Sequence, residues 1–334
     1  MRFPGHRIVK TTVAVFLTAL ICELIGWPPV FAVITAIVTL EPTVSDSIKK
    51  GIVRFPASAI GSFYAVLFIY LFGNSPLTYT LAAALTIITC YRLKLHAGLL
   101  VATITAVAMI EVVYDHYLLS FFIRLGTTTI GLTVSTLVNL LIFPPNFMKE
   151  INKNLRNIYI DIGHTLFSLL QSDEKIIDKK MKKLQNSISK TEELIRYEIS
   201  DAKYFRTDEE KQTAISHVEI LLEKLRFIQY HLTNLQPIRL KETIFTEEHQ
   251  QIIRDSVEAL ASYITGKSEV NPFHYELKLR EIMDSYWIEG LTPNEADQVE
   301  LPKELVLLYE LISIFYLVNK LSTEKNARVL IKIQ

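Results

Sequence analysis

Residues 120–143 read SFFIRLGTTTIGLTVSTLVNLLIF, an uninterrupted apolar and small-polar run whose only charge is Arg124. A helix that crosses a bilayer needs about 20 predominantly apolar residues. This run is therefore predicted to be a membrane span. Thr128, Gly131, Ser135 and Asn139 follow Arg124 at spacings of three and four, which places all five residues in a stripe about 80° wide on one face of the helix.

Five more apolar segments precede this run, at about 8–26, 28–42, 54–73, 76–91 and 95–113. The second and fourth fall just short of the minimum length of about 17 residues for a span, and are either re-entrant or shielded by their neighbours. No small-residue cleavage site follows the first segment, so it is expected to be retained as a span rather than removed as a signal peptide. The sequence thus predicts an all-α fold with a six-span transmembrane domain over 1–145.

Charge separates this part of the chain from the rest. Residues 1–148 hold nine of the 35 basic residues and five of the 35 acidic ones, a net charge of +4, which leaves 26 basic and 30 acidic residues, net −4, for 149–334. The first part has too few charges for a water-exposed surface. The zero total argues against nucleic-acid binding, and two cysteines, Cys22 and Cys90, are too few for a disulfide scaffold or a zinc site.

Lysine and arginine also set the expected orientation, because cytoplasmic loops are enriched in them. The N-terminus, the loops after the second and fourth spans and the exit from the sixth contain Arg2, Arg7, Lys10, Lys49, Lys50, Arg54, Arg92, Lys94, Lys149, Lys153 and Arg156. The alternate loops, at 26–28, 73–76 and 113–119, contain none. Both termini are therefore predicted to be cytoplasmic, in a multi-pass protein of the cell membrane.

A short internal similarity links the third and sixth spans. Residues 54–61 read RFPASAIG and residues 124–131 read RLGTTTIG, so both elements begin with arginine and end with Ile-Gly, and Ser58 corresponds to Thr128. Halves of three spans each must have opposite topology, and inverted repeats of this kind are common in secondary transporters, with the binding site at their interface. The similarity therefore suggests a 3+3 inverted repeat. The short second and fourth spans do not fit it, because they are not equivalent members of the two halves.

The polar residues in these spans permit two interpretations. Arg54 and Arg124 could offer positive charge to an anion, since charge inside a membrane is costly and usually functional. Arg54 could equally anchor its helix in the lipid headgroups, and Arg124 could extend to them. The serines and threonines, with Ser58, Thr128, Ser135 and Asn139 as candidates, could line a pathway or could let the helices pack closely.

Two carboxylates near span ends are candidates for proton coupling. Glu23 lies at the outer end of the first span and Glu111 at the outer end of the fifth, where either could also pair with Arg124; a solvated boundary position is the alternative. Glu41 and Asp46 flank an inner loop and are expected to cap a helix.

Residues 146–334 are predicted to form a cytoplasmic bundle of four to six helices with coiled-coil character. Apolar residues recur at spacings of three and four through 146–171, and further helices fit about 172–205, 208–236, 247–266, 273–288 and 301–322. The region has no glycine-rich phosphate loop, no nucleophile elbow and no histidine or cysteine with metal-ligand spacing. We therefore expect no enzyme, no metal and no cofactor.

Several of these segments resemble a known family. The opening Arg7-x-x-Lys10-Thr11-Thr12-Val13-Ala14, the stretch AIVTLEPT at 36–43 and the two arginine elements are similar to bacterial aromatic acid exporter family proteins. That wider group includes fusaric acid resistance proteins and plant aluminium-activated malate transporters. The resemblance covers the whole chain, and it implies six spans, a helical C-terminal domain and outward movement of organic, often aromatic, carboxylates.

The leading hypothesis is a secondary-active exporter of organic carboxylate anions that works as a homo-oligomer, a dimer, in the lipid bilayer, with Arg124 and Arg54 on the anion route. Two alternatives follow from the same sequence. One is a membrane-anchored sensor or assembly protein whose output is the helical bundle, and the other is a passive anion channel.

Overall fold

The computed structural model describes residues 5–111, 116–142, 147–171, 174–203, 209–238, 240–289 and 302–323. These residues form helices and connecting turns, with no strand among them, as the all-α prediction requires. The elements are α1 (His6–Ile25), α2 (Val30–Thr39), α3 (Val44–Phe72), α4 (Pro76–Arg92), η1 (His96–Gly98), α5 (Leu99–Ile110), α6 (Tyr117–Leu141), α7 (Met148–Gln171), α8 (Glu174–Ala202), α9 (Glu209–Leu235), η2 (Leu240–Glu242), α10 (Glu247–Ile264), α11 (His274–Glu289) and α12 (Lys303–Thr323).

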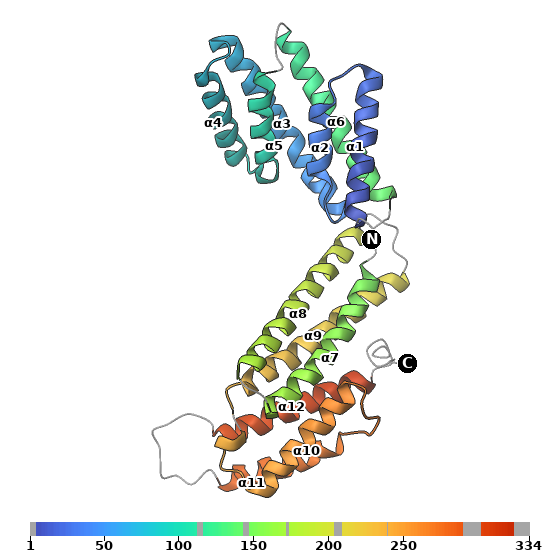
Figure 1. Cartoon of the computed structure of the whole chain (residues 1–334), viewed down its shortest axis with the longest axis vertical. Coiled ribbons are helices and arrows are strands. Elements are labelled where there is room, and N and C mark those ends of the chain that lie inside the picture. Colours follow the sequence, from blue (N-terminus) through green and yellow to red (C-terminus); the bar gives the residue numbers. More distant parts are fainter. Residues whose placement is uncertain are drawn as a thin grey trace. The chain divides into compact units, whose positions relative to one another are not determined.

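The chain folds into two compact units (Figure 1). The first contains residues 1–145 together with the end of α8 around Ser200 and Asp201, and the second contains the rest of α8 with α7 and α9–α12. The first unit is coloured blue to green for most of its length, and the second is green to red.

In the first unit, α3 and α6 are the two central helices. Helix α3 contacts α4, α5 and α6, whereas α6 contacts α1, α2 and α3. Further contacts join α1 to α2 and α4 to α5. The packing of α3 against α4 and α5 thus has a counterpart in the packing of α6 against α1 and α2.

Helix bounds repeat at the same offset as the arginine elements. Adding 70 to the bounds of α1, α2 and α3 gives 76–95, 100–109 and 114–142, close to those of α4, α5 and α6. The shortest of the six are α2, with 10 residues, and α5, with 12. The structure therefore differs from our expectation that the second and fourth segments are the short ones. The short helices are the second and fifth, which are equivalent members of the two halves.

Two glycines let the backbones of the two halves, α1–α3 and α4–α6, approach each other closely. A Cβ atom added at Gly61 on α3 would lie 2.3 Å from the carbonyl oxygen of Ala102 on α5. One added at Gly131 on α6 would lie 2.4 Å from the carbonyl oxygen of Ala32 on α2. The two glycines are related by the repeat offset, and so are the two alanines. The same close contact between the halves therefore occurs twice.

Three helices of the first unit, α1, α3 and α6, are long and apolar enough to cross a membrane, and α2 and η1–α5 are shorter apolar helices. Helix α3 begins at Val44, well before the segment expected from hydropathy, and it continues through Pro56. The early start is explained by its caps: the Thr43 hydroxyl accepts a hydrogen bond from Asp46 N at 2.9 Å, and the Asp201 carboxylate accepts one from Ser45 N at 2.9 Å. Arg54 therefore lies inside the helix rather than at its first turn.

The second unit is a helical assembly around one apolar core, to which α7–α12 all contribute. Helix α12 is also long and apolar enough to cross a membrane by composition. Its Leu308, Ile314, Phe315 and Val318 are fully buried in this core. The apolar composition of α12 is thus accounted for by packing inside the unit.

Candidate anion site

Helices α3 and α6 pack antiparallel to each other. Near the middle, the Ser58 and Thr128 hydroxyl oxygens lie 3.3 Å apart, and towards one end the Asn139 side-chain amide donates to the Ser47 hydroxyl at 3.0 Å. Residue numbers thus rise on one helix as they fall on the other. Arg54 and Arg124 each precede the central contact by four residues, so they lie on opposite sides of it, each about 6 Å away along its helix.

Arg124 is the most enclosed charge of this helix pair, with 3% of its surface exposed. Its guanidinium carbon lies 4.3 Å from the centre of the Phe31 ring of α2, and its Nη2 donates to the Thr105 hydroxyl of α5. Among the described residues, no atom accepts a hydrogen bond from Nε or Nη1. A buried, charged donor without an acceptor is costly, so Arg124 offers two donor nitrogens to an anion.

Arg54 has a different environment, because the carboxylate of Glu41, in the loop between α2 and α3, neutralises it. Its Nη2 lies 2.9 Å from a Glu41 carboxylate oxygen and its Nε donates to the Ala97 carbonyl at 3.2 Å, while Nη1 finds no acceptor among the described residues. Lys50 Nζ binds the other Glu41 oxygen at 2.9 Å. Burial by itself would raise the pKa of Glu41, but hydrogen bonds from Lys50 and Arg54 outweigh it and lower the pKa below its ordinary value. Glu41 is therefore an ionised partner of Arg54 and not a helix cap.

The two carboxylates suggested for proton coupling have no hydrogen bond to either arginine. Glu111 follows the last residue of α5, is exposed, and accepts a hydrogen bond from the Tyr79 hydroxyl of α4. Glu23 lies in the last turn of α1 and is exposed.

The remaining candidate pathway residues are buried and engaged in helix packing. Thr128 donates to the Arg124 carbonyl at 2.9 Å in addition to its contact with Ser58, and Ser135 donates to the Leu132 carbonyl at 3.1 Å. Such hydrogen bonds let small polar residues fit between closely packed helices. The contacts therefore favour the packing interpretation for these residues in the conformation described.

Asn139 joins three segments at the end of the helix pair that lies beyond Arg54. Its side-chain oxygen accepts from Lys10 Nζ of α1 at 2.8 Å, and its amide donates to the Glu41 and Thr43 carbonyls, each at 3.1 Å. All of these groups are in the first unit. Asn139 thus ties α1 and the α2–α3 loop to the end of α6.

The sequence prediction missed Glu41, Thr105 and Phe31 as site residues. A signal for two of them exists, because the repeat offset relates Glu41 to Glu111 and Thr35 to Thr105. The spacing found for the arginines therefore extends to both. Phe31 has no such signal, since its equivalent is Val101.

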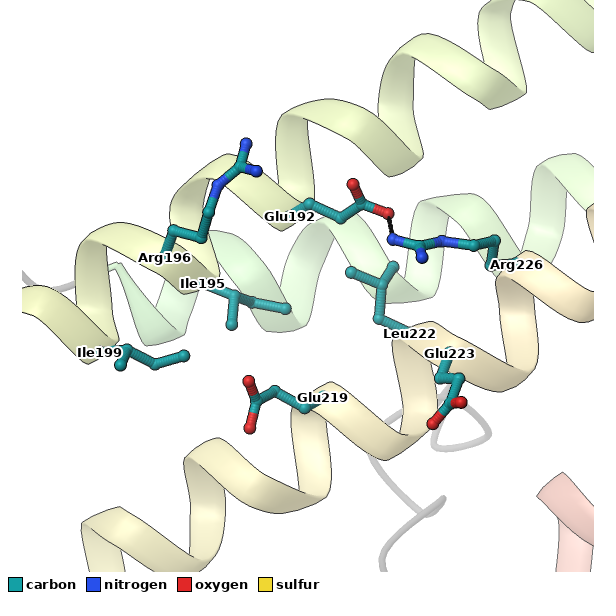
Figure 2. Close-up of a pocket in the computed structure, with 8 residues that line it drawn as sticks. All are labelled: Glu192, Ile195, Arg196, Ile199, Glu219, Leu222, Glu223 and Arg226. Atoms are coloured by element: carbon teal, nitrogen blue, oxygen red, sulfur yellow. Dashed lines mark hydrogen bonds and ion pairs between the residues drawn. The ribbon is translucent and has the colours of Figure 1, made fainter.

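The second unit contains a groove between α8 and α9 of about 340 Å³ (Figure 2). Ile195 and Leu222 contribute apolar surface to its lining, and Glu192 of α8 forms an ion pair with Arg226 of α9. Figure 2 shows the Glu219 carboxylate pointing into the space between the helices. Among the described residues, no three histidine, cysteine or acidic side chains form a group that could hold a metal ion.

A second cavity, of about 400 Å³, lies between α9, α11 and α12. Phe227, Tyr309 and Tyr316 line it, together with His231 and Arg280, both of which contact acids: His231 contacts Glu310, and Arg280 lies 2.8 Å from Glu276. Because its basic groups are already paired, this cavity is a weaker anion site than the surroundings of Arg124.

The apolar helices of the first unit, with a buried arginine between them, define a helical multi-pass membrane protein. Comparison with known proteins supports this class. Residues 2–142 match the family model described as aromatic acid exporter family member 1.

Relatives extend the similarity over nearly the whole chain. A UPF0421 protein of Oceanobacillus iheyensis is 47% identical over 327 residues, covering 94% of each chain. A UPF0421 protein of Bacillus cereus is 38% identical over 329 residues, covering 95% of this chain and 92% of its own, and one of Staphylococcus haemolyticus is 39% identical over 239 residues, covering 69% and 72%. The chain belongs to the UPF0421 family by its full-length relatives, its residues 2–142 match the aromatic acid exporter model, and it is a membrane protein of the transporter type.

Proposed function

We propose that this protein exports organic carboxylate anions, aromatic ones in particular, across the cell membrane by secondary-active transport. The observation that carries the proposal is Arg124, a buried guanidinium with two donor nitrogens for which the described residues supply no acceptor. A carboxylate has two oxygens in the geometry that a guanidinium binds best.

An aromatic side chain beside Arg124 supports an aromatic substrate. The Phe31 ring of α2 stacks on the guanidinium, with its centre 4.3 Å from the guanidinium carbon. An aromatic acid would place its carboxylate on Arg124 and its ring against Phe31. Both α2 and α5, the equivalent short helices, contribute to the surroundings of Arg124, and short helices at corresponding positions of two halves are typical of a transporter's binding site.

Energy would come from an electrochemical gradient, because no nucleotide-binding motif is present in the sequence. Glu23 and Glu111 are the proposed proton-coupling carboxylates. We further propose that both termini are cytoplasmic, that α1–α6 supply six spans and that the protein acts as a dimer.

The test is efflux from cells that produce the Arg124→Gln variant at the same membrane abundance as the unchanged protein. Loss of carboxylate efflux supports the proposal, since glutamine keeps a polar side chain while removing the charge. Unchanged efflux would remove Arg124 from the mechanism. Thr129→Val is a matched control on α6, because Thr129 is exposed and donates only to its own helix at the Leu125 carbonyl, 2.9 Å away.

A further inference from the structure

We propose that Glu41 and Glu111 are equivalent gating residues, each of which closes one end of the α3–α6 pair by binding the arginine of its own half. This inference rests on the proposed function, because a gate needs a transported ligand.

The equivalence follows from pairs of residues that share one spacing. The offset that relates Arg54 to Arg124 also relates Glu41 to Glu111. Ser58 and Thr128, at the same spacing, contact each other at the centre of the antiparallel pair, where a two-fold axis relating the halves would bring equivalent residues together. The same offset relates the close approach of α3 to α5, at Gly61 and Ala102, to that of α6 to α2, at Gly131 and Ala32. The two halves are therefore an inverted repeat.

The two ends of this repeat are in different states. At one end Glu41 binds Arg54 and Lys50, and Asn139 holds the neighbouring loop. At the other end the carboxylate of Glu111 accepts from Tyr79, and Arg124 keeps two donor nitrogens without acceptors among the described residues. The ion pair between carboxylate and arginine is thus formed at one end and absent at the other.

Inverted repeats account for alternating access, because the two halves can exchange conformations around a fixed site. In the second state Glu111 would bind Arg124, and Glu41 would release Arg54. A substrate carboxylate on Arg124 occupies the place that Glu111 takes in the second state, so the two compete. The ligand class implied is a small carboxylate anion that keeps Glu111 from pairing with Arg124 until it leaves.

The test is a distance measurement in the full-length protein. With Cys22 and Cys90 replaced by alanine, spin labels are attached at Leu24→Cys and Leu71→Cys. Leu24 and Leu71 are 79% and 55% exposed, near the ends of α1 and α3. The end of α3 lies with the start of α6, as the 5.9 Å contact between the Tyr70 and Tyr117 rings indicates, and therefore at the Arg124 end.

Glu41→Gln and Arg54→Gln, which break the closed pair, should each raise the population of short label distances, because the Arg124 end closes when the other end opens. Glu111→Gln should give the same distance distribution as the unchanged protein, because the pair between Glu111 and Arg124 is not formed in this state. Identical distributions in all variants would overturn the proposal, and so would an equal shift caused by Glu111→Gln.

Flux through proteoliposomes gives the second readout. Because Glu111 is exposed, Glu111→Gln is expected to fold even if the Glu41 variant does not. Its maximal benzoate flux should fall about tenfold while its apparent affinity stays within about twofold, as expected for loss of a gate rather than of a binding group. Normal flux would overturn the gating role. If the unchanged protein carries no carboxylate but Glu41→Gln still shifts the distances, the carboxylate substrate is refuted, while the coupling between the two ends is supported for a different transported ligand.

Discussion

At the scale of single residues, the proposed anion site depends on the different environments of Arg54 and Arg124. Arg54 has a carboxylate and a carbonyl as acceptors, whereas Arg124 has one hydroxyl and an aromatic ring. An unsatisfied buried donor costs about 1–3 kcal/mol, and more when it is charged. A bound carboxylate would remove that cost, which is the reason for proposing Arg124 as the anion site.

Glycine at position 131 should be required for the contact between α6 and α2. In Gly131→Ala the new methyl group would meet the Ala32 carbonyl, a backbone atom that cannot rotate away, and overpacking of this kind costs about 1–3 kcal/mol. We expect a lower melting temperature of the purified protein. Gly51→Ala is the matched control, because its nearest contact, Leu132 Cδ2 at 3.7 Å, is ordinary. Equal melting temperatures for the two variants would contradict the close approach.

The ion pairs of Glu41 should make stability depend on pH in a defined direction. The folded-state pKa of Glu41 lies below the ordinary 4.5, so the stabilisation is complete above pH 4.5 and is lost as the pH falls through the lowered value. Glu41→Gln should therefore be less stable than the unchanged protein at pH 7, by on the order of 2 kcal/mol. This difference should shrink in acid. Melting curves from pH 3 to 7 measure it, with exposed Glu23→Gln as control; a constant difference would argue against the pairing.

At the scale of elements, the sequence predicts the helices well and their lengths less well. Hydropathy and periodicity place the described α-helices within a few residues at most ends. The start of α3 is not predicted from hydropathy because one of its caps is Asp201, which is far from Ser45 along the chain. The length of α2 is not predicted because the apolar run continues past Thr39 to Leu40, and that of α5 because the apolar segment begins with the short helix η1. The repeat spacing is visible in the sequence, but which arginine is neutralised depends on side-chain positions and is not.

Asn139 should hold the end of α6 to the start of α3. Asn139→Ala removes the side-chain donor for the Glu41 and Thr43 carbonyls and leaves Lys10 only the backbone carbonyl of residue 139, and each buried group left unpaired costs about 1–3 kcal/mol. We expect a clear loss of thermal stability and faster hydrogen exchange of the first-turn amides of α3. The variant Thr129→Val, on the same helix, should change neither. If both variants exchange alike, Asn139 does not join these elements.

At the scale of the whole molecule, the net charge of zero is the sum over two units that differ in their content of charged residues. The first is poor in charge and exposes apolar side chains such as Phe16, Leu24 and Leu100, as expected of helices in contact with lipid. The second is rich in charge and buries its apolar residues in one core. Helix α12 has the length and composition of a span, but its buried Glu310 contacts His231 and Asn234 of α9 within this unit.

Membrane topology tests this interpretation of α12. If α12 packs within its unit and does not cross the membrane, the positions before and after it lie on the same side. In chains without other cysteines, Lys175→Cys and Thr323→Cys should both react with a membrane-impermeant maleimide only after the cells are permeabilised. Labelling of the Thr323 variant in intact cells, with the Lys175 variant protected, would show instead that α12 is a span.

The most direct test of the central claim is carboxylate flux through the purified protein in liposomes. A panel of labelled aromatic and aliphatic carboxylates is loaded inside, and efflux is measured with and without a proton gradient, for the unchanged protein and for Arg124→Gln. We predict gradient-dependent efflux that favours aromatic acids and falls at least about tenfold in the variant, as for loss of a charged binding group. Equal efflux through the two proteins would contradict a role of Arg124 in transport. The absence of efflux for every carboxylate in the panel would contradict carboxylate export.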